Sequence, residues 1–212
     1  MPIKYTRKEE QANSISHSLG IILVLAACIY FLSQPSIRTD TLSVLGFILY
    51  AFGGMSSYLA STIYHASPMQ SKIREKLRKW DHAAIYWHIA GSYSPITLAF
   101  MAERQECGWG LFIIVWLCAL IGSISSFRGL KEHSNVETVC FVCMGLLVLL
   151  TFKPVLDCIG WTAMSFIIAE GVAFITGAVF YSFNKIRYMH TVFHIFVLLG
   201  SVFHITALYY MI

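Results

Sequence analysis

The apolar stretch Gly20-Ile-Ile-Leu-Val-Leu-Ala-Ala-Cys-Ile-Tyr-Phe-Leu-Ser33 decides the fold class. It is part of a longer segment, residues 14–33, that contains no Asp, Glu, Lys or Arg. About 20 helical residues cross the hydrocarbon core of a bilayer, so this segment is long enough to span a membrane. Because no small-residue cleavage site follows a short apolar core, we expect a retained helix and not a signal peptide.

The composition of the whole chain agrees with this reading of one segment. Hydrophobic residues make up 57% of the sequence and charged residues only 12%, whereas charged residues are about 25% of a typical soluble domain. We therefore expect an all-α membrane protein: a cytoplasmic N-terminal tail over residues 1–13 and one seven-helix bundle over residues 14–212. The expected transmembrane helices are residues 14–33, 41–65, 81–101, 108–127, 136–152, 159–183 and 190–212.

The distribution of Lys and Arg predicts the orientation of the bundle. Twelve of these residues fall in the N-terminal tail and the even-numbered loops, and three fall on the opposite side. Since basic residues accumulate in cytoplasmic loops, we expect the N-terminus in the cytoplasm and the C-terminus outside. The most basic loop, residues 72–79, is expected to form a short amphipathic helix on the membrane surface. Pro95 is expected to kink the third helix.

Cysteine content and net charge add little about function. The six cysteines include one Cys-x-x-Cys pair, Cys140 and Cys143. This pair lies in an apolar segment, where cysteine behaves as a small hydrophobic residue, so we expect no disulfide and no redox site. The net charge of +4 implies no nucleic-acid partner.

His190 and His194 have the spacing of a metal-chelating pair. Residues four apart on an α-helix lie about 40° apart around the axis and about 6 Å apart along it, so both rings can reach one point. With the expected topology, His65 ends the second helix and Asp81 begins the third at the same cytoplasmic depth. Three imidazoles with a carboxylate or water is the usual ligand set of catalytic zinc.

The same depth argument assigns catalytic roles. Asp81 is the candidate base, because zinc can lower the pKa of a bound water to about 7. Ser61, one helical turn before His65, could donate a hydrogen bond to a developing oxyanion.

Four motifs of the chain resemble one known family. They are Glu10-x-x-Asn13-Ser-x-Ser-His17-x-x-Gly20, Ser61-Thr-Ile-Tyr-His65, Asp81-His-x-x-Ile-Tyr-x-x-Ile-Ala-Gly-Ser-Tyr-Ser-Pro95 and His190-x-x-x-His194. Together they resemble the bacterial haemolysin III branch of the progestin and adipoQ receptor family, which is related to the alkaline ceramidases.

The resemblance implies a multi-pass protein of the bacterial cytoplasmic (plasma) membrane. It also implies a Zn²⁺ ion held by His65, His190 and His194, with Asp81 and Ser61 beside a water. The chain lacks the long N-terminal domain of the animal receptors, so adiponectin-like hormone recognition does not follow from the resemblance.

The other buried ionisable residues receive separate predictions. His17 is expected to buttress the site by hydrogen bonding, His82 to be structural or interfacial, and His88 to line a cavity. His204 lies about 15 Å deeper than His194 and is not expected to join the cluster; His133 is an ordinary loop residue. Glu170 is expected to face the bundle interior, either on a substrate or ion pathway or as a buried hydrogen-bonding group.

Three functional hypotheses remain open. The first is a zinc-dependent hydrolase of an amide or ester bond, with a membrane lipid or lipid-like small molecule as its partner. The second is a receptor-like or transport-like bundle in which zinc is structural. The third, suggested by the haemolysin name, is a pore-forming cytolysin. The sequence does not set the oligomeric state.

Overall fold

The chain folds into a bundle of α-helices. The computed structural model describes residues 5–102, 107–129, 135–183 and 185–212. These residues contain no strand, which confirms the all-α membrane class. The elements are α1 (Arg7–Ser33), α2 (Pro35–Arg38), α3 (Thr41–Ala66), α4 (Arg74–Ser94), the π-helical segment η1 (Pro95–Met101), α5 (Cys107–Gly129), α6 (Asn135–Gly145), the 3₁₀ segment η2 (Leu146–Thr151), α7 (Phe152–Ser182) and α8 (Met189–Met211).

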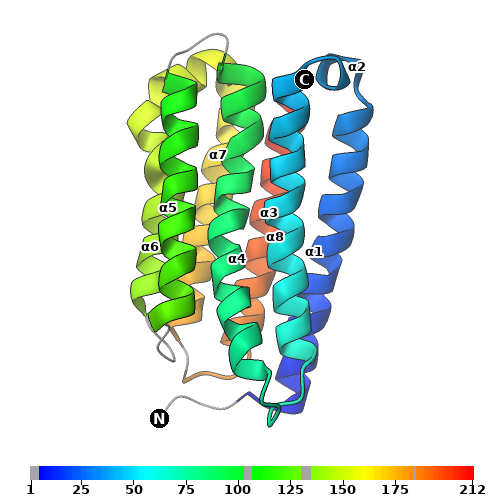
Figure 1. Ribbon diagram of the computed structural model, residues 1–212, viewed down its shortest axis with the longest axis vertical. Helices are drawn as coiled ribbons and strands as arrows, with labels where there is room; N and C mark the ends of the chain where they lie inside the picture. The colour runs from blue at the N-terminus through cyan, green and yellow to red at the C-terminus, as the bar shows by residue number, and fades with distance from the viewer. Residues whose placement is uncertain (1–4, 103–106, 130–134, 184) are drawn as a thin grey trace.

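The long helices run side by side along the long axis of the molecule. Figure 1 shows α1, α3, α4, α5, α6, α7 and α8 in this arrangement, with the short α2 at the upper end. Helix α1 begins at the lower end and α8 finishes at the upper end, as an odd number of passes requires. Which end faces the cytoplasm stays a prediction from the charge distribution.

Five stretches among the described residues are long and apolar enough to cross a membrane. They are Arg7–Ser33, Thr41–Ala66, Cys107–Arg128, Val136–Ser182 and Met189–Met211. The fourth is 47 residues long and contains α6, η2 and α7, which correspond to two expected spans. Gly160 interrupts α7 with a φ of 74°, a conformation that glycine adopts without steric cost. Helix α4 is not in this set, because its first two turns carry several charged residues.

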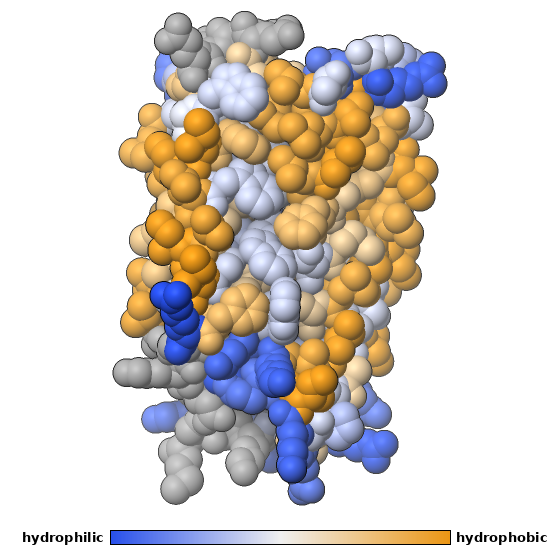
Figure 2. Space-filling view, viewed as in Figure 1, coloured by the Kyte–Doolittle hydropathy of each residue, from blue (hydrophilic) through white to orange (hydrophobic). Residues whose placement is uncertain are grey.

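The outer surface is apolar where lipid would contact it. Large apolar side chains such as Ile22, Ile121 and Leu150 are 66%, 67% and 76% exposed. Figure 2 shows apolar side chains on both sides of a paler central column, with strongly hydrophilic ones gathered at the lower end and at the upper right. Contiguous apolar surface of this extent is rare on soluble monomers, so it identifies the surface that faces lipid.

Two helix starts lie earlier in the chain than expected. Helix α1 begins at Arg7, within the segment expected to be a tail, because Thr6 and Glu9 form a capping box there. Helix α4 begins at Arg74 and continues unbroken past Asp81. The prediction of a separate surface helix over residues 72–79 was therefore wrong. No helix-breaking residue separates the basic segment from the third span, so both form one helix.

Pro95 begins a π-helical segment in place of a simple kink. Proline has no backbone N–H and leaves a carbonyl of the preceding turn without its usual donor. Hydroxyl groups supply hydrogen bonds in this region: Ser94 donates to the Ala90 carbonyl and Thr97 to the Tyr93 carbonyl, both at 2.9 Å. Widened turns of this kind are frequent at functional sites.

Glycines bring α3 and α4 into close contact. A Cβ atom added to Gly53 would lie 2.2 Å from the Trp87 carbonyl oxygen and 3.2 Å from the Gly91 Cα. The two backbones therefore touch here, as small residues permit in membrane helices. This contact fixes α4, with Asp81, beside α3, with Ser61 and His65.

The six cysteines are all free, as expected. Cys140 and Cys143 lie in α6 with exposed side chains. His133 falls outside the described residues.

Candidate metal centre

Three imidazoles converge at the lower end of the bundle. His65 is the penultimate residue of α3, and His190 and His194 lie on the first turns of α8. One ring nitrogen from each lies within 4.8 Å of the others, and the Nε2 atoms of His65 and His190 are 3.2 Å apart. His65 and His194 are 2% and 1% exposed. The predicted convergence of these three side chains is therefore present.

The start of α8 is held in place by α1. Tyr188, the residue before α8, has a left-handed backbone with a φ of 62°. Its backbone N–H donates to Glu9 Oε1 at 2.9 Å, so the first carboxylate of α1 provides the hydrogen-bond acceptor for this strained residue. Strain of this kind persists only where the surroundings over-determine it. The contact sets the angle at which α8 presents His190 and His194.

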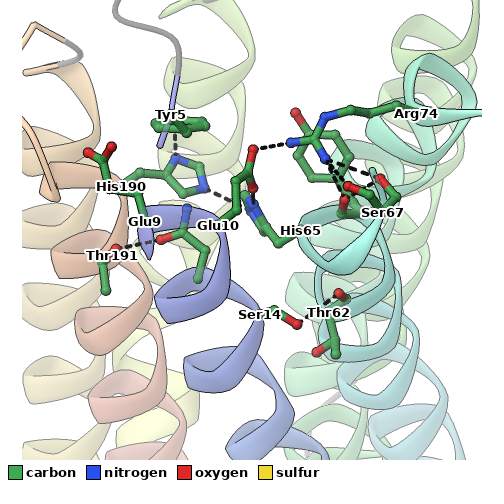
Figure 3. A network of polar contacts seen from close by, with 12 residues as sticks. Tyr5, Glu9, Glu10, Ser14, Thr62, His65, Ser67, Arg74, His190 and Thr191 are labelled. Atoms are coloured by element: carbon green, nitrogen blue, oxygen red, sulfur yellow. Dashed lines mark hydrogen bonds and ion pairs between the residues drawn. The ribbon is translucent and has the colours of Figure 1, made fainter. Parts of the chain in front are cut away.

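Each of the three imidazoles uses its Nδ1 atom for a contact with the N-terminal segment. His65 Nδ1 donates to Glu10 Oε2 at 2.6 Å, and His190 Nδ1 lies 3.0 Å from the Tyr5 hydroxyl. His194 Nδ1 donates to the Asn13 carbonyl at 3.2 Å. Figure 3 shows Tyr5 over His190 and Glu10 beside His65.

These contacts are the ones that metal-ligating histidines make. A histidine that binds a metal usually donates its other ring N–H to a carboxylate, a carbonyl or a hydroxyl group, which fixes the tautomer and the ring orientation. With Nδ1 engaged in all three rings, Nε2 is the ring nitrogen that would bind an ion, and the Nε2 atoms of His65 and His190 face one another. Ser16 Oγ, 3.1 Å from His194 Nδ1, adds a second contact to that ring.

Charged groups of two helices support the site and contact the end of a third. Glu10 of α1 also pairs with Arg74 of α4. Arg74 donates in turn to the Tyr64 and Ser67 carbonyls at 3.0 and 2.8 Å, at the C-terminal end of α3. Cations at this end of a helix are favourable because they complement the helix dipole. Burial raises the pKa of the Tyr5 hydroxyl above its ordinary value, so Tyr5 stays protonated.

The donor set fits a zinc ion. Neutral imidazole nitrogens are ordinary zinc ligands, and three protein ligands leave a fourth position open. Imidazoles also bind copper, iron and nickel, so the three imidazoles could hold any of these metals.

Asp81 and Ser61 lie beside the cluster in one large cavity. The cavity has a volume of about 360 Å³, and its lining is mostly apolar but includes both residues together with His190 and His194. Asp81 is 8% exposed, and the hydroxyl of the buried Ser61 interacts with the Asp81 carboxylate. The carboxylate is not one of the three grouped ligands.

Two of the remaining histidines have clear neighbours near the site. His17 stacks on His194 with ring centroids 3.6 Å apart. Neither of its ring nitrogens has a partner among the described residues, so the expected hydrogen-bonding buttress is a stacking contact instead. His82 Nδ1 lies 2.9 Å from Glu137 Oε2, which ties α4 to α6, in agreement with its expected structural role.

Two histidines lie deeper in the bundle. His88 lines the cavity, as expected. His204 is separate from the cluster, also as expected, and its Nδ1 donates to Glu170 Oε2 at 2.8 Å. Glu170 therefore faces the interior as a buried hydrogen-bonding group.

Sequence reasoning assigned no role to four residues that support the imidazoles, namely Tyr5, Glu10, Asn13 and Arg74. A signal for two of them was present. Glu10, Asn13, His17 and Gly20 recur at intervals of three and four residues, which places them on one helix face. A polar stripe on that face predicts contact with the bundle interior. Overall hydropathy instead assigned Glu10 and Asn13 to the N-terminal tail.

Comparison with known proteins identifies the family. The family model described as Haemolysin-III related matches residues 5–205. The chain belongs to the haemolysin-III-related family. The match contains Tyr5, Glu10 and the three clustered histidines.

Individual relatives of the haemolysin-III-related chain cover almost its whole length. It is 33% identical to Hemolysin-3 of Bacillus cereus over 92% of this chain and 87% of the relative. It is 30% identical to a Hemolysin-3 homolog of Bacillus subtilis (strain 168), over 93% and 91%. It is also similar to the human Monocyte to macrophage differentiation factor, at 25% identity over 97% of this chain and 85% of the relative.

Proposed function

We propose that this haemolysin-III-related protein is a zinc-dependent hydrolase of the bacterial plasma membrane that cleaves an amide or ester bond of a lipid-like substrate. The observation that carries the proposal is the cluster of His65, His190 and His194 beside an apolar cavity that also contains Asp81 and Ser61. An apolar cavity with a few convergent polar groups is the usual form of a small-molecule site.

Each residue of the cavity has a distinct task in this proposal. Zinc, when bound by the three imidazoles, would polarise a carbonyl and lower the pKa of a water. Asp81 then accepts the proton of the attacking water at its carboxylate. Ser61, whose buried hydroxyl lies beside the Asp81 carboxylate, donates its hydroxyl hydrogen to the oxygen that gains negative charge. The apolar lining keeps bulk water away.

The proposed test is turnover by purified protein in lipid nanodiscs. Zinc-loaded protein is incubated with panels of lipid amides and esters, and the released acids are measured by mass spectrometry. Asp81→Asn should lower turnover by about 100- to 10,000-fold and retain its zinc. The matched control is Asp157→Asn, because the Asp157 side chain is 47% exposed and pairs only with Lys153 of the same helix turn among the described contacts. Full turnover in Asp81→Asn would contradict the role of Asp81.

A structural metal is the second candidate, and His17 favours it. This buried ring stacks on His194 and offers two nitrogens without partners in the described chain, so a rotation could supply a fourth ligand and close the coordination shell. In that case His65→Ala lowers the melting temperature and leaves the lipid composition of the cell unchanged. X-ray absorption of the zinc-loaded protein then shows four nitrogen ligands and no oxygen.

The printed name of the Bacillus cereus relative, Hemolysin-3, raises a third activity. A pore-forming protein would release dye from liposomes in proportion to its concentration and without dependence on zinc. The hydrolase proposal predicts no dye release from intact liposomes of a lipid that the protein does not cleave.

A further inference from the structure

A second polar cluster lies deeper in the same cavity than the three clustered imidazoles. It consists of His88 of α4, Glu170 of α7 and His204 of α8, all of which line the cavity. The three side chains are 8%, 8% and 2% exposed. Their position is set by the helices: ten residues separate His194 from His204, which is about 15 Å at helical rise.

This cluster keeps unused hydrogen-bonding capacity. Glu170 accepts from His204 through Oε2, and a carboxylate has a second oxygen for another donor. His204 Nε2 and the Tyr50 hydroxyl are buried without a partner within the described residues. The Tyr50 ring stacks on His204 at 5.4 Å between centroids, which holds the imidazole in place.

Stability alone does not account for the buried contact between Glu170 and His204. Replacing a buried ion pair by apolar residues is often neutral or stabilising, and ionisable residues inside membrane helices generally mark a functional site. The carboxylate and the imidazoles line a cavity whose walls are mainly apolar, so a polar group of a ligand that reaches beyond the metal centre would be bound at this cluster.

We propose that Glu170, His204 and His88 bind a hydroxyl group carried on the hydrocarbon chain of the lipid whose reacting bond lies at the metal centre. Because His204 donates through Nδ1, its Nε2 is an acceptor, as is the second oxygen of Glu170, whereas neutral His88 offers one N–H donor; a hydroxyl group both donates and accepts. An ammonium group only donates and would leave the His88 N–H without an acceptor. The inference rests on the proposed function for the position of the reacting bond.

The depth of the cluster predicts where the hydroxyl group lies on the hydrocarbon chain of the lipid. His88 is seven residues after Asp81, about 10 Å along the helix, and His204 is about 15 Å from His194. An extended hydrocarbon chain advances by about 1.3 Å per carbon, given C–C bonds of about 1.5 Å. The hydroxyl therefore lies about 8 to 12 carbons from the reacting carbonyl, in the middle of a long acyl chain.

The test is a binding comparison that requires no turnover. The affinities of 10-hydroxystearate, 2-hydroxystearate and stearate for zinc-loaded full-length protein in nanodiscs are measured by calorimetry. One added hydrogen-bonded group should make the 10-hydroxy acid bind about 3- to 10-fold more tightly than the other two. The paired change Glu170→Leu with His204→Phe should abolish this preference, measured as the ratio of the two affinities within the variant, and Glu170→Gln, which keeps an acceptor oxygen but no charge, should reduce it. Glu75→Gln, at an exposed carboxylate outside the membrane segments, should retain it.

The outcomes separate this inference from the proposed function. Equal affinity of wild type for the 10-hydroxy acid and stearate would overturn the hydroxyl site and leave the hydrolase proposal standing. Tighter binding of 10-aminostearate than of 10-hydroxystearate would overturn the assignment to a hydroxyl group. Binding of none of the acids would overturn the hydroxyl site, whereas the hydrolase proposal is tested separately by the turnover of zinc-loaded protein. The stearate affinity of each variant also reports whether it is folded.

Discussion

The Nε2 atoms of His65 and His190 lie 3.2 Å apart, although 125 positions of the chain separate the two residues. Both rings use Nδ1 for contacts with the N-terminal segment, so their Nε2 atoms face one another. The third ring, His194, lies next to both, with ring centroids 5.1 and 4.5 Å away. The N-terminal segment holds all three rings through their other nitrogens, so α1 belongs to the site as much as α3 and α8 do.

Glu10 should control the metal affinity through His65. Glu10→Ala removes the acceptor of the His65 Nδ1–H and the ion pair with Arg74. Loss of such an outer partner lowers metal affinity by about 10- to 100-fold. Competition with a chromogenic chelator measures the change, and Glu75→Gln is the control because its carboxylate pairs with Arg78 outside the site. Unchanged zinc affinity in Glu10→Ala would show that this contact does not orient His65.

Replacement of Tyr188 by glycine should stabilise the protein. A left-handed backbone costs a residue with a Cβ about 1–2 kcal/mol, and the greater unfolded-state entropy of glycine offsets about 0.4–1 kcal/mol of the relief. We expect Tyr188→Gly to be stabilised by about 0.5–1 kcal/mol in detergent unfolding. Tyr188→Val, which is β-branched, should be destabilised instead. A Tyr188→Gly protein less stable than wild type would mean that the side chain contributes more than the strain removes.

Gly53 should tolerate no side chain. An alanine Cβ would lie 2.2 Å from the Trp87 carbonyl oxygen, so α3 and α4 must separate. Overpacking of this kind costs about 1–3 kcal/mol, to be measured as the free energy of unfolding. Gly110 is the matched control, because an added Cβ meets nothing within 4 Å there. Gly110→Ala should be neutral or more stable by about 0.5–1 kcal/mol. Equal effects at the two glycines would contradict the close approach of α3 and α4.

The helices could be predicted from hydropathy because a membrane requires long apolar segments. The expected spans 41–65, 108–127 and 190–212 differ from α3, α5 and α8 by no more than two residues at either end. The start of α1 could not be predicted in this way. Glu9, Glu10 and Asn13 are buried because other polar groups bind them, and hydropathy counts them as solvent-exposed.

The candidate site could be predicted only in part. Depth along the axis follows from counting residues at 1.5 Å each, and this was enough to group His65 with His190 and His194. The rotation of each helix and the identity of its neighbours cannot be counted in that way. The contacts of His204 with Glu170 and of His82 with Glu137 join α8 to α7 and α4 to α6, and they depend on that lateral order.

Metal content of purified protein tests the central claim most directly. Elemental analysis of wild type should find one zinc ion per chain, and saturating zinc at about 100 times Kd should raise the free energy of unfolding by about 2.7 kcal/mol. His65→Ala, His190→Ala and His194→Ala should each lose most of the metal, whereas His204→Ala should retain it. Wild-type protein without bound metal, or full zinc in His194→Ala, would contradict the assignment of these three histidines as one metal centre.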